Sequence, residues 1–311
     1  MHQIAAIIAA IVVGTWNGNW FPSGRAEHRA HPDVEAATSR AAAKMLSDGL
    51  ASVDPEGTND VILVLNEIRG PRSASDLVAQ IGRKGLSVAS ISAYRRRDRF
   101  DQQQDVIATT LPVAAKGWSV WKNHKKETPP RGYAFASLVL SPAVTATVFA
   151  VHLKSNYGAT TEEIRELNRA KRLHAAEQLS RQTSRDAYAV VAGDMNADPW
   201  RKEFAKDAVF DVFAAAGFAN LMSLAPPEDR GTHPHRRYGD SCLDHILCKG
   251  LSVVSPPKVV PNDSLSDHYA VFAVIDAGNQ PSGSSGFAPF LGLGGSKTKP
   301  RPSRGNMHYT Q

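Results

Sequence analysis

The chain has 311 residues, of which 42% are hydrophobic, so it can bury a sizeable core as one large α/β domain or two small ones. This content excludes a disordered protein. Lys and Arg outnumber Asp and Glu by 36 to 30, and the resulting net charge of +6 suits a polyanionic substrate without requiring one.

An apolar run of ten residues, 4–13, lies near the start of the chain. Its length matches the core of a signal peptide and is too short to span a bilayer. No Lys or Arg precedes it, and cleavage near Gly14 would remove what looks like a buried first strand, so we favour a strand. We expect a cytoplasmic protein without stable membrane insertion. Secretion or periplasmic export is the alternative if residues 1–14 act as a signal.

Predicted strands alternate with predicted helices along most of the chain. Several strands are continuous apolar runs, typical of sheets buried on both faces or within a sandwich. We predict strands at residues 8–15, 61–65, 86–92, 135–140, 146–152, 187–193, 243–248 and 269–275. We predict helices at residues 34–49, 74–84 and 161–183, the second capped by Ser73 and the third opened by a capping box of Thr160 and Glu163.

The composition changes at residue 278 to Gly, Ser, Pro, Lys and Arg. Such a segment cannot bury enough apolar surface to fold. We therefore divide the chain into a folded domain, residues 1–277, and a disordered basic tail, residues 278–311, and we expect a monomer. The tail could attract a polyanion, but a solubilising extension is the simpler interpretation.

The two cysteines, Cys242 and Cys248, lie in or next to one predicted strand. Along an extended segment they are about 20 Å apart, well beyond disulfide reach. We expect both to be small buried residues. Because a Cys-rich zinc site needs more thiolates, any metal should be held by oxygen and imidazole.

Polar residues follow two of the apolar strands. In VAGDMNADPW, Asp194 and Asn196 are two positions apart, so their side chains share one face. The carboxylate can bind a hard cation or take a proton from water, and the amide can donate to a phosphoryl oxygen. An Asx turn is the alternative for this pair. Glu67 follows the strand at 61–65, where an exposed loop charge is the alternative.

Later strands carry imidazole and carboxylate groups. His152 and Lys154 end the strand at 146–152 and are able to contact phosphate, although a lone histidine at a strand end is more often structural. Asp244 lies in an apolar strand, where an unpaired charge would be costly, so a histidine partner is expected.

The segment DSLSDHYA contains Ser266, Asp267 and His268. A Ser-His-Asp triad needs side chains from distant strands and a Ser on a tight elbow, and the sequence has no G-x-S-x-G motif. We interpret Ser266 as a turn or capping residue and expect water to be the nucleophile.

Six polar features follow one another along the chain: an Asn after the first strand, an isolated Glu after the second, His-Leu-Lys-Ser, Gly-Asp-x-Asn, a late strand Asp and Ser-Asp-His. In this order they resemble the motifs of the endonuclease/exonuclease/phosphatase superfamily, and the resemblance covers about residues 8–275. The resemblance implies a four-layer α/β/β/α sandwich of two mixed sheets flanked by helices, with the active site at one end. It also implies a hydrolase acting on phosphoester bonds.

Carried over residue by residue, the resemblance implies that Asn17, Glu67 and Asp267 surround Mg²⁺ or Mn²⁺, with Glu67 as the principal ligand. Asp194 and Asn196 would activate and orient the attacking water.

The two imidazoles have separate implied roles. His268 would pair with Asp244, stay cationic because of that pairing, and contact the scissile phosphate. His152 would match the second imidazole of deoxyribonuclease I and the sphingomyelinases, although the sequence offers no clear acidic partner for it.

Three residues are candidates for substrate binding: Arg69, Lys154 and Tyr133. Arg69 resembles the Arg after the catalytic Glu of deoxyribonuclease I, but a surface residue or a phosphate clamp is also consistent with the sequence. An aromatic such as Tyr133 is more often simply a core residue. Basic clusters at residues 93–100 and 122–126 suit a nucleic-acid backbone.

We therefore predict a divalent-metal-dependent nuclease that hydrolyses DNA or RNA. The alternative activity is that of a phosphatase or phospholipase C-type phosphoesterase acting on inositol phosphates, sphingomyelin or other small phosphate esters. A member that binds nucleic acid or a partner protein without catalysis is a further class. The complete polar set argues against it, because buried polar groups without partners cost stability.

Overall fold

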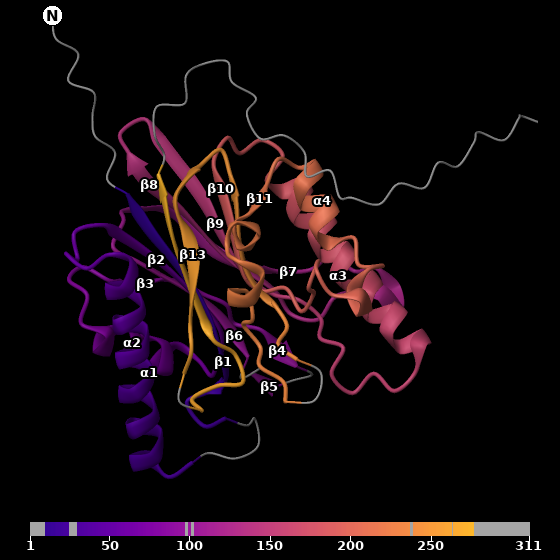
Figure 1. Ribbon diagram of the computed structural model, residues 1–311, viewed down its shortest axis with the longest axis horizontal. Helices are drawn as coiled ribbons and strands as arrows, with labels where there is room; N and C mark the ends of the chain where they lie inside the picture. The colour runs from indigo at the N-terminus through magenta and orange to yellow at the C-terminus, as the bar shows by residue number, and fades with distance from the viewer. Residues whose placement is uncertain are drawn as a thin grey trace, which may run out of the picture. The chain divides into compact units, whose positions relative to one another are not determined.

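The computed structural model describes residues 10–24, 30–96, 99–100, 103–236, 239–262 and 264–276, with the backbone alone at residues 96, 99 and 100 (Figure 1). The tail predicted at residues 278–311 lies outside the described residues, as do residues 1–9. Among the described residues, no helix is long and apolar enough to cross a membrane.

Two mixed six-stranded sheets form the centre of the fold. The first has the order β13-β14-β1-β2-β6-β3, and its strands are β1 (Ile11–Phe21), β2 (Asp60–Ile68), β3 (Ser87–Ile91), β6 (Gln104–Thr109), β13 (Ser252–Val260) and β14 (Ala270–Asp276). The second has the order β11-β12-β10-β9-β8-β7, and its strands are β7 (Val113–Val120), β8 (Gly132–Ser141), β9 (Val144–His152), β10 (Ala189–Asp194), β11 (Ala219–Asn220) and β12 (Asp244–Lys249). A short ribbon pairs β4 (Arg95–Arg96) with β5 (Arg99–Phe100).

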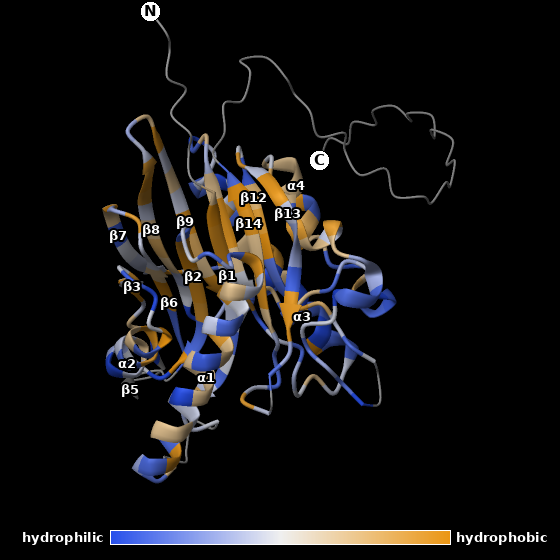
Figure 2. Cartoon of the chain, turned by 60° about the vertical axis from the view of Figure 1, so that its left-hand side comes forward, coloured by the Kyte–Doolittle hydropathy of each residue, from blue (hydrophilic) through white to orange (hydrophobic). Residues whose placement is uncertain are grey.

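Helices cover the outer face of each sheet. Figure 1 shows α1 (Pro32–Val53) and α2 (Pro71–Ile81) on the side opposite α3 (Glu162–Gln182) and α4 (Val209–Ala215). The remaining turns of helix are η1 (Lys125–Glu127), η2 (Lys202–Phe204), η3 (Leu221–Leu224) and η4 (Pro227–Asp229). Figure 2 shows apolar colour concentrated on the central strands. The predicted four-layer α/β/β/α sandwich is therefore confirmed.

The core between the sheets is built by alternate residues of the strands. Ile62 and Val64 of β2 face Val148 and Ala150 of β9 in one buried cluster. The intervening residues of the same strands pack under the helices instead. This alternation decides which side chains emerge at the ends of the strands between the two sheets.

The sequence located most elements, but both predicted helix caps are wrong. α2 begins at Pro71 with Gly70 as its N-cap, earlier than the predicted cap at Ser73, because proline suits the first position of a helix. α3 is capped by Thr161, whose hydroxyl accepts from the Ile164 amide, so Thr160 is not the cap and Glu163 does not complete a capping box.

Both cysteines are buried and neither forms a disulfide, as predicted. Cys242 and Cys248 belong to the core between the sheets.

Candidate active site

At one end of the sandwich, polar side chains occupy the strand positions that face the opposite sheet. Strands of both sheets contribute them. β1 and β2 are parallel, as are β9 and β10, while β6, β12 and β14 run the other way and begin where those strands end. The same faces that carry apolar residues in mid-sheet therefore end in polar groups at this edge. These groups are Asn17, Asn66, Asp105, His152, Asp194 and Asp244, all of them buried.

Asp194 lies at the centre of the cluster. Its Oδ2 is 3.0 Å from Asn17 Nδ2 and 2.9 Å from Asn196 Nδ2, and both amides donate to it. The same oxygen is 3.5 Å from His152 Nε2 and 3.8 Å from His268 Nε2. One carboxylate oxygen is thus surrounded by four nitrogen groups from four separate segments.

Asp194 is tied down at its backbone as well. The Asn196 amide N–H donates to Asp194 Oδ1 at 2.8 Å, and the Asp194 amide donates to Asn66 Oδ1 at 3.1 Å. The preceding Gly193 has φ +133, and a Cβ built there would lie 2.0 Å from the Val151 carbonyl oxygen. The Gly-Asp pair therefore lets the two strands approach closely enough to place the carboxylate.

A left-handed backbone turns Glu67 toward the same cluster. Strict alternation would place its side chain with Leu65 under the helices, but Glu67 has φ 57 and follows the point where the β2–β6 register shifts. Glu67 Oε1 lies 3.3 Å from Asn17 Nδ2 and 3.7 Å from His152 Nε2. Such a conformation is costly for a residue other than glycine and is concentrated at functional sites.

The two central histidines have opposite electrostatic environments. His268 Nδ1 lies 2.7 Å from Asp244 Oδ2. Burial alone would lower the pKa of His268, but the carboxylates of Asp244 and Asp194 outweigh it and raise the pKa to about 10. The ring is therefore cationic at neutral pH, with Nδ1–H donating to Asp244.

His152 is held neutral. Burial lowers its pKa well below the usual value, and the positive charges of Arg131 and His268 lower it further. Arg131 donates to the His152 carbonyl oxygen at 3.2 Å. Among the described residues nothing hydrogen-bonds to the buried Nδ1, so the proton belongs on Nε2, which faces the two carboxylates. The acidic partner that the sequence did not reveal is thus absent from the described surroundings of Nδ1.

Burial also raises the pKa of Asp194, to about 7, an effect to which the nearby Asp244 carboxylate adds and which His268 opposes. A carboxylate with this pKa is well matched to exchange protons near neutral pH.

Three buried residues behind the site were not recognised in the sequence. Asn66 Nδ2 donates to Asp105 Oδ1 at 2.7 Å, and the Tyr94 hydroxyl donates to Asp105 Oδ2 at 2.9 Å. Asn66 also accepts a hydrogen bond from the Asp194 backbone amide, so this chain of hydrogen bonds fixes the catalytic end of β10. The signal available was the pair of polar residues, Asn66 and Asp105, at the ends of two apolar runs.

Seven of the eight residues expected in the metal and catalytic set form one contact network, and a carboxylate oxygen of the eighth, Asp267, lies within 4.8 Å of a ring nitrogen of His268. Asp267 lies at the rim, with 55% of its side chain exposed and its Oδ2 3.9 Å from His233 Nε2. His233, which sequence reasoning missed, packs its ring 4.8 Å from that of His268. The seven that form one contact network are Asn17, Glu67, His152, Asp194, Asn196, Asp244 and His268.

The three residues expected to bind substrate lie in different surroundings. Arg69 pairs with Glu35 of α1 at 2.7 Å, and only 15% of its side chain is exposed. The Tyr133 ring packs against Phe149 in the cluster beneath α3, at a centroid distance of 5.6 Å. Lys154 is half-buried after His152, and its Nζ donates to the Ser155 carbonyl at 2.7 Å.

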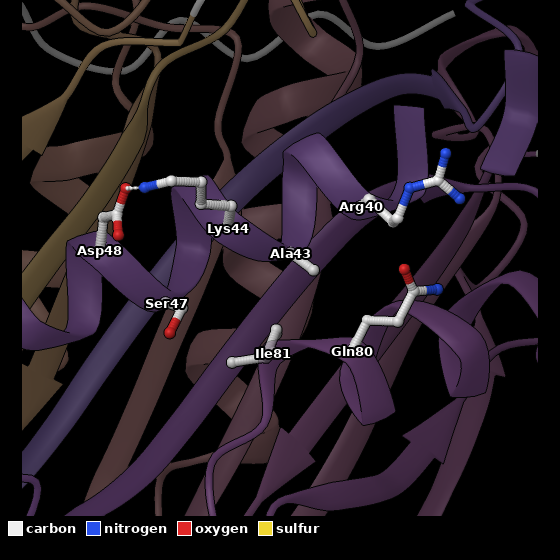
Figure 3. Close-up of a pocket in the computed structure, with 7 residues that line it drawn as sticks. All are labelled: Arg40, Ala43, Lys44, Ser47, Asp48, Gln80 and Ile81. Atoms are coloured by element: carbon white, nitrogen blue, oxygen red, sulfur yellow. Dashed lines mark hydrogen bonds and ion pairs between the residues drawn. The ribbon is translucent and has the colours of Figure 1, made fainter. Parts of the chain in front are cut away.

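A separate groove of about 480 Å³ lies between α1 and α2 (Figure 3). Figure 3 shows Lys44 and Asp48 of α1 paired with each other along its wall. The groove shares no residue with the polar cluster, and it presents no convergent set of catalytic groups. Its lining residues are Arg40, Ala43, Lys44, Ser47, Asp48, Gln80 and Ile81.

The donor set of the cluster fits a hard divalent cation. Carboxylate and amide oxygens are the ligands that such cations prefer. Glu67 supplies the carboxylate, and Asn17 would supply its amide oxygen by turning over its amide, because its Nδ2 donates to Glu67 Oε1 and its Oδ1 accepts from the Asn19 amide. The carboxylates of Asp194 and Asp244 also lie within 4.8 Å of each other.

Comparison with known proteins identifies the family. The sequence model of the Endonuclease/Exonuclease/phosphatase family matches residues 14–268. The chain belongs to this family. Its members hydrolyse phosphoester bonds, so the chain is assigned to that class of hydrolase, and the resemblance seen in the sequence is confirmed. No curated protein matches the chain.

Solved structures of the family share its fold. An endonuclease/exonuclease/phosphatase from Beutenbergia cavernae is 16% identical, with a TM-score of 0.60 over 86% of this chain and 72% of that one. A family protein from Leptotrichia buccalis is 13% identical, with a TM-score of 0.60 over 86% and 100% of the two chains. Sphingomyelinase C from Streptomyces griseocarneus is 17% identical, with a TM-score of 0.55 over 85% and 99%. At these identities the likeness shows the fold alone.

Proposed function

We propose that the protein is a divalent-metal-dependent nuclease that hydrolyses DNA or RNA phosphodiester bonds by attack of water. The observation that carries this proposal is the environment of Asp194, where one carboxylate oxygen faces a cationic imidazole, a neutral imidazole and two amides. Such a set can deprotonate water and stabilise charge on phosphorus at the same place.

The nucleophilic step begins with proton transfer to Asp194. Its raised pKa, about 7, makes it able to accept a proton from water near neutral pH. The Asn196 amide, 2.9 Å from the same carboxylate oxygen, orients the water. The water oxygen forms a bond to phosphorus as the ester bond on the opposite side breaks.

The two imidazoles act on the charge that develops. His268, kept cationic by Asp244, stabilises the nonbridging phosphate oxygens without acting as a base. His152 offers its Nε2–H as a donor to the departing alkoxide or to a nonbridging oxygen. Glu67 and Asn17 would hold Mg²⁺ or Mn²⁺, which when bound supplies positive charge beside the phosphate.

Basic residues on the segments that lead to and from the site favour a polyanionic substrate over a small ester. Lys154 is half-buried two residues after His152, and the loop before Arg131 exposes Lys122, Lys125 and Lys126. Burial and the charge of Arg131 lower the pKa of Lys154. Contacts of this kind bind successive phosphates and make affinity depend on salt.

A phospholipase C-type activity on sphingomyelin is the second candidate. It is supported by the fold shared with sphingomyelinase C, of which 99% is covered. It is also supported by the pairing of Arg69 with Glu35, because this pairing engages within the protein the arginine that the resemblance to deoxyribonuclease I would place on nucleic acid.

A substrate panel distinguishes the two candidates. Plasmid DNA, single-stranded DNA, RNA, sphingomyelin and phosphoinositides are each incubated with Mg²⁺, with Mn²⁺ and with EDTA. We expect cleavage of nucleic acid with either metal, loss of cleavage with EDTA, and a fall in rate as salt is raised. Hydrolysis of sphingomyelin or phosphoinositides without any cleavage of nucleic acid would refute the nuclease proposal.

A further inference from the structure

A second cluster of potential ligands lies outside the active site, where the η1 loop packs against α3. His174 Nε2 of α3 is 2.7 Å from Glu127 Oε2, and His124 Nδ1 is 3.3 Å from the same oxygen. Ligand atoms of all three residues lie within 4.8 Å of one another. The cluster shares no residue with the catalytic network, and α3 takes no part in that network.

The two imidazoles stack on each other beside Glu127. Their centroids are 3.7 Å apart and their planes are inclined by 33°. Because a carboxylate oxygen can only accept, His174 Nε2–H donates to Glu127 Oε2 in the absence of an ion, and a bound ion would take the place of this proton. The other nitrogen of His174, Nδ1, is 3.5 Å from Glu177 Oε2, a carboxylate that can accept its proton. When an ion binds at Nε2, the remaining ring proton lies on Nδ1 and faces Glu177.

The loop that carries His124 and Glu127 is held in place before any ion arrives. The His124 amide donates to Thr128 Oγ1 at 2.7 Å, and the Thr128 hydroxyl is 2.8 Å from Asn123 Oδ1. The Lys122 amide donates to Gln178 Oε1 at 2.7 Å, one turn beyond His174 on α3. Two ligands therefore come from an ordered loop and one from a rigid helix, as a preorganised site requires.

The cluster is accessible to an ion from solvent. The His124 side chain is 55% exposed and that of Glu127 is 44% exposed, while His174 is 17% exposed. Two imidazole nitrogens and one carboxylate oxygen form a ligand set of the kind bound by zinc and other late transition metals, and Mg²⁺ prefers oxygen alone. Water would complete the coordination.

We propose that His124, Glu127 and His174 bind a transition-metal ion of the zinc class. Such an ion ties the η1 loop, with its exposed Lys122, Lys125 and Lys126, to α3. The same loop leads to Arg131, which supports the His152 carbonyl, so occupancy of the site also stiffens one wall of the active site.

Metal binding to the full chain, carrying no added histidines, tests the proposal. Zn²⁺ is titrated calorimetrically with Mg²⁺ in large excess, and Co²⁺ is titrated with detection of its visible absorption. The variants are His174→Ala and Glu127→Gln. The matched control is His31→Ala, which removes an exposed histidine 3.4 Å from Asp33 at the start of α1. Binding at the catalytic residues is common to all four proteins and cancels in the comparison.

We expect both cluster variants to bind Zn²⁺ at least about 100-fold more weakly at one site. Losing a residue that hydrogen-bonds to a metal ligand already weakens binding by about 10- to 100-fold, and losing the ligand itself should weaken it further. His31→Ala should bind as the wild type does. Trypsin gives a second readout, because Zn²⁺ should protect Lys125 and Lys126 from cleavage in the wild type and not in Glu127→Gln. Equal Zn²⁺ affinity in the wild type and both cluster variants, with equal protection, would overturn the proposal.

Discussion

The buried carboxyl of Asp105 makes a sharp prediction about stability and pH. Asp105 is fully buried behind the active site and accepts hydrogen bonds from Asn66 and Tyr94. Burial raises its pKa from 3.8 to about 7, more than those two donors and the charge of Arg131 can offset. The substitution Asp105→Asn keeps the shape of the side chain and removes its ionisation.

The size of the effect follows from the pKa. A rise from 3.8 to about 7 corresponds to about 4 kcal/mol between the two protonation states. The folded protein holds this proton more tightly than the unfolded chain does. The free energy of unfolding contributed by Asp105 is therefore fully present below pH 3.8 and is lost as the pH rises through about 7.

Urea unfolding of both proteins across the range from about pH 4 to about pH 8 measures the difference. As the pH rises over this range, the free energy of unfolding of Asp105→Asn should increase relative to that of the wild type by up to about 4 kcal/mol. Most of this change should occur below pH 7. Ionisation of Asp194 is common to both proteins and cancels. A difference in unfolding free energy that does not change with pH would refute the argument that burial keeps Asp105 protonated.

Three further predictions concern other buried groups. His268→Gln, which keeps a donor toward Asp244 but loses the positive charge, should lower kcat by about 100- to 1000-fold in a phosphodiesterase assay while circular dichroism stays unchanged. Arg172→Met should cost about 3–5 kcal/mol in urea unfolding, because it leaves the buried carboxylate of Asp207 without its partner; a loss below about 1 kcal/mol, as for an exposed pair, would contradict this. Cys242 and Cys248 should react with a thiol reagent only after unfolding, since burial raises the pKa of both thiols, that of Cys248 to about 12; rapid labelling of the native protein would show that they are accessible.

Most of the strands that the sequence revealed are buried on both faces, which leaves an apolar run. β2 and β10 are of this kind, with almost every residue buried. β8 was found although it is half-buried, and β6 was missed although it is buried throughout. β7 was missed because it is a largely exposed edge strand without apolar alternation. β13 was missed because Pro256 and Pro257 read as a break, which an edge strand tolerates.

The site was predictable where a polar residue interrupts an apolar pattern, as Asp194 and Asp244 do. The orientation of the Glu67 side chain was not predictable, because it depends on a left-handed backbone conformation that departs from the regular alternation of a strand. The pairing of Arg69 with Glu35 joins residues far apart along the chain, and nothing local signals it. The same holds for His124 and His174, which only the packing of the η1 loop on α3 brings together.

The central claim is that Asp194 is the proton acceptor of a phosphoester hydrolase. Hydrolysis of bis(p-nitrophenyl) phosphate with Mg²⁺ or Mn²⁺ measures it directly in the wild type, in Asp194→Asn, and in Asp211→Asn, which changes an exposed aspartate of α4. We expect Asp194→Asn to lower kcat by about 100- to 10,000-fold with the fold intact, and Asp211→Asn to leave kcat unchanged. Turnover by Asp194→Asn at the wild-type rate would contradict the claim.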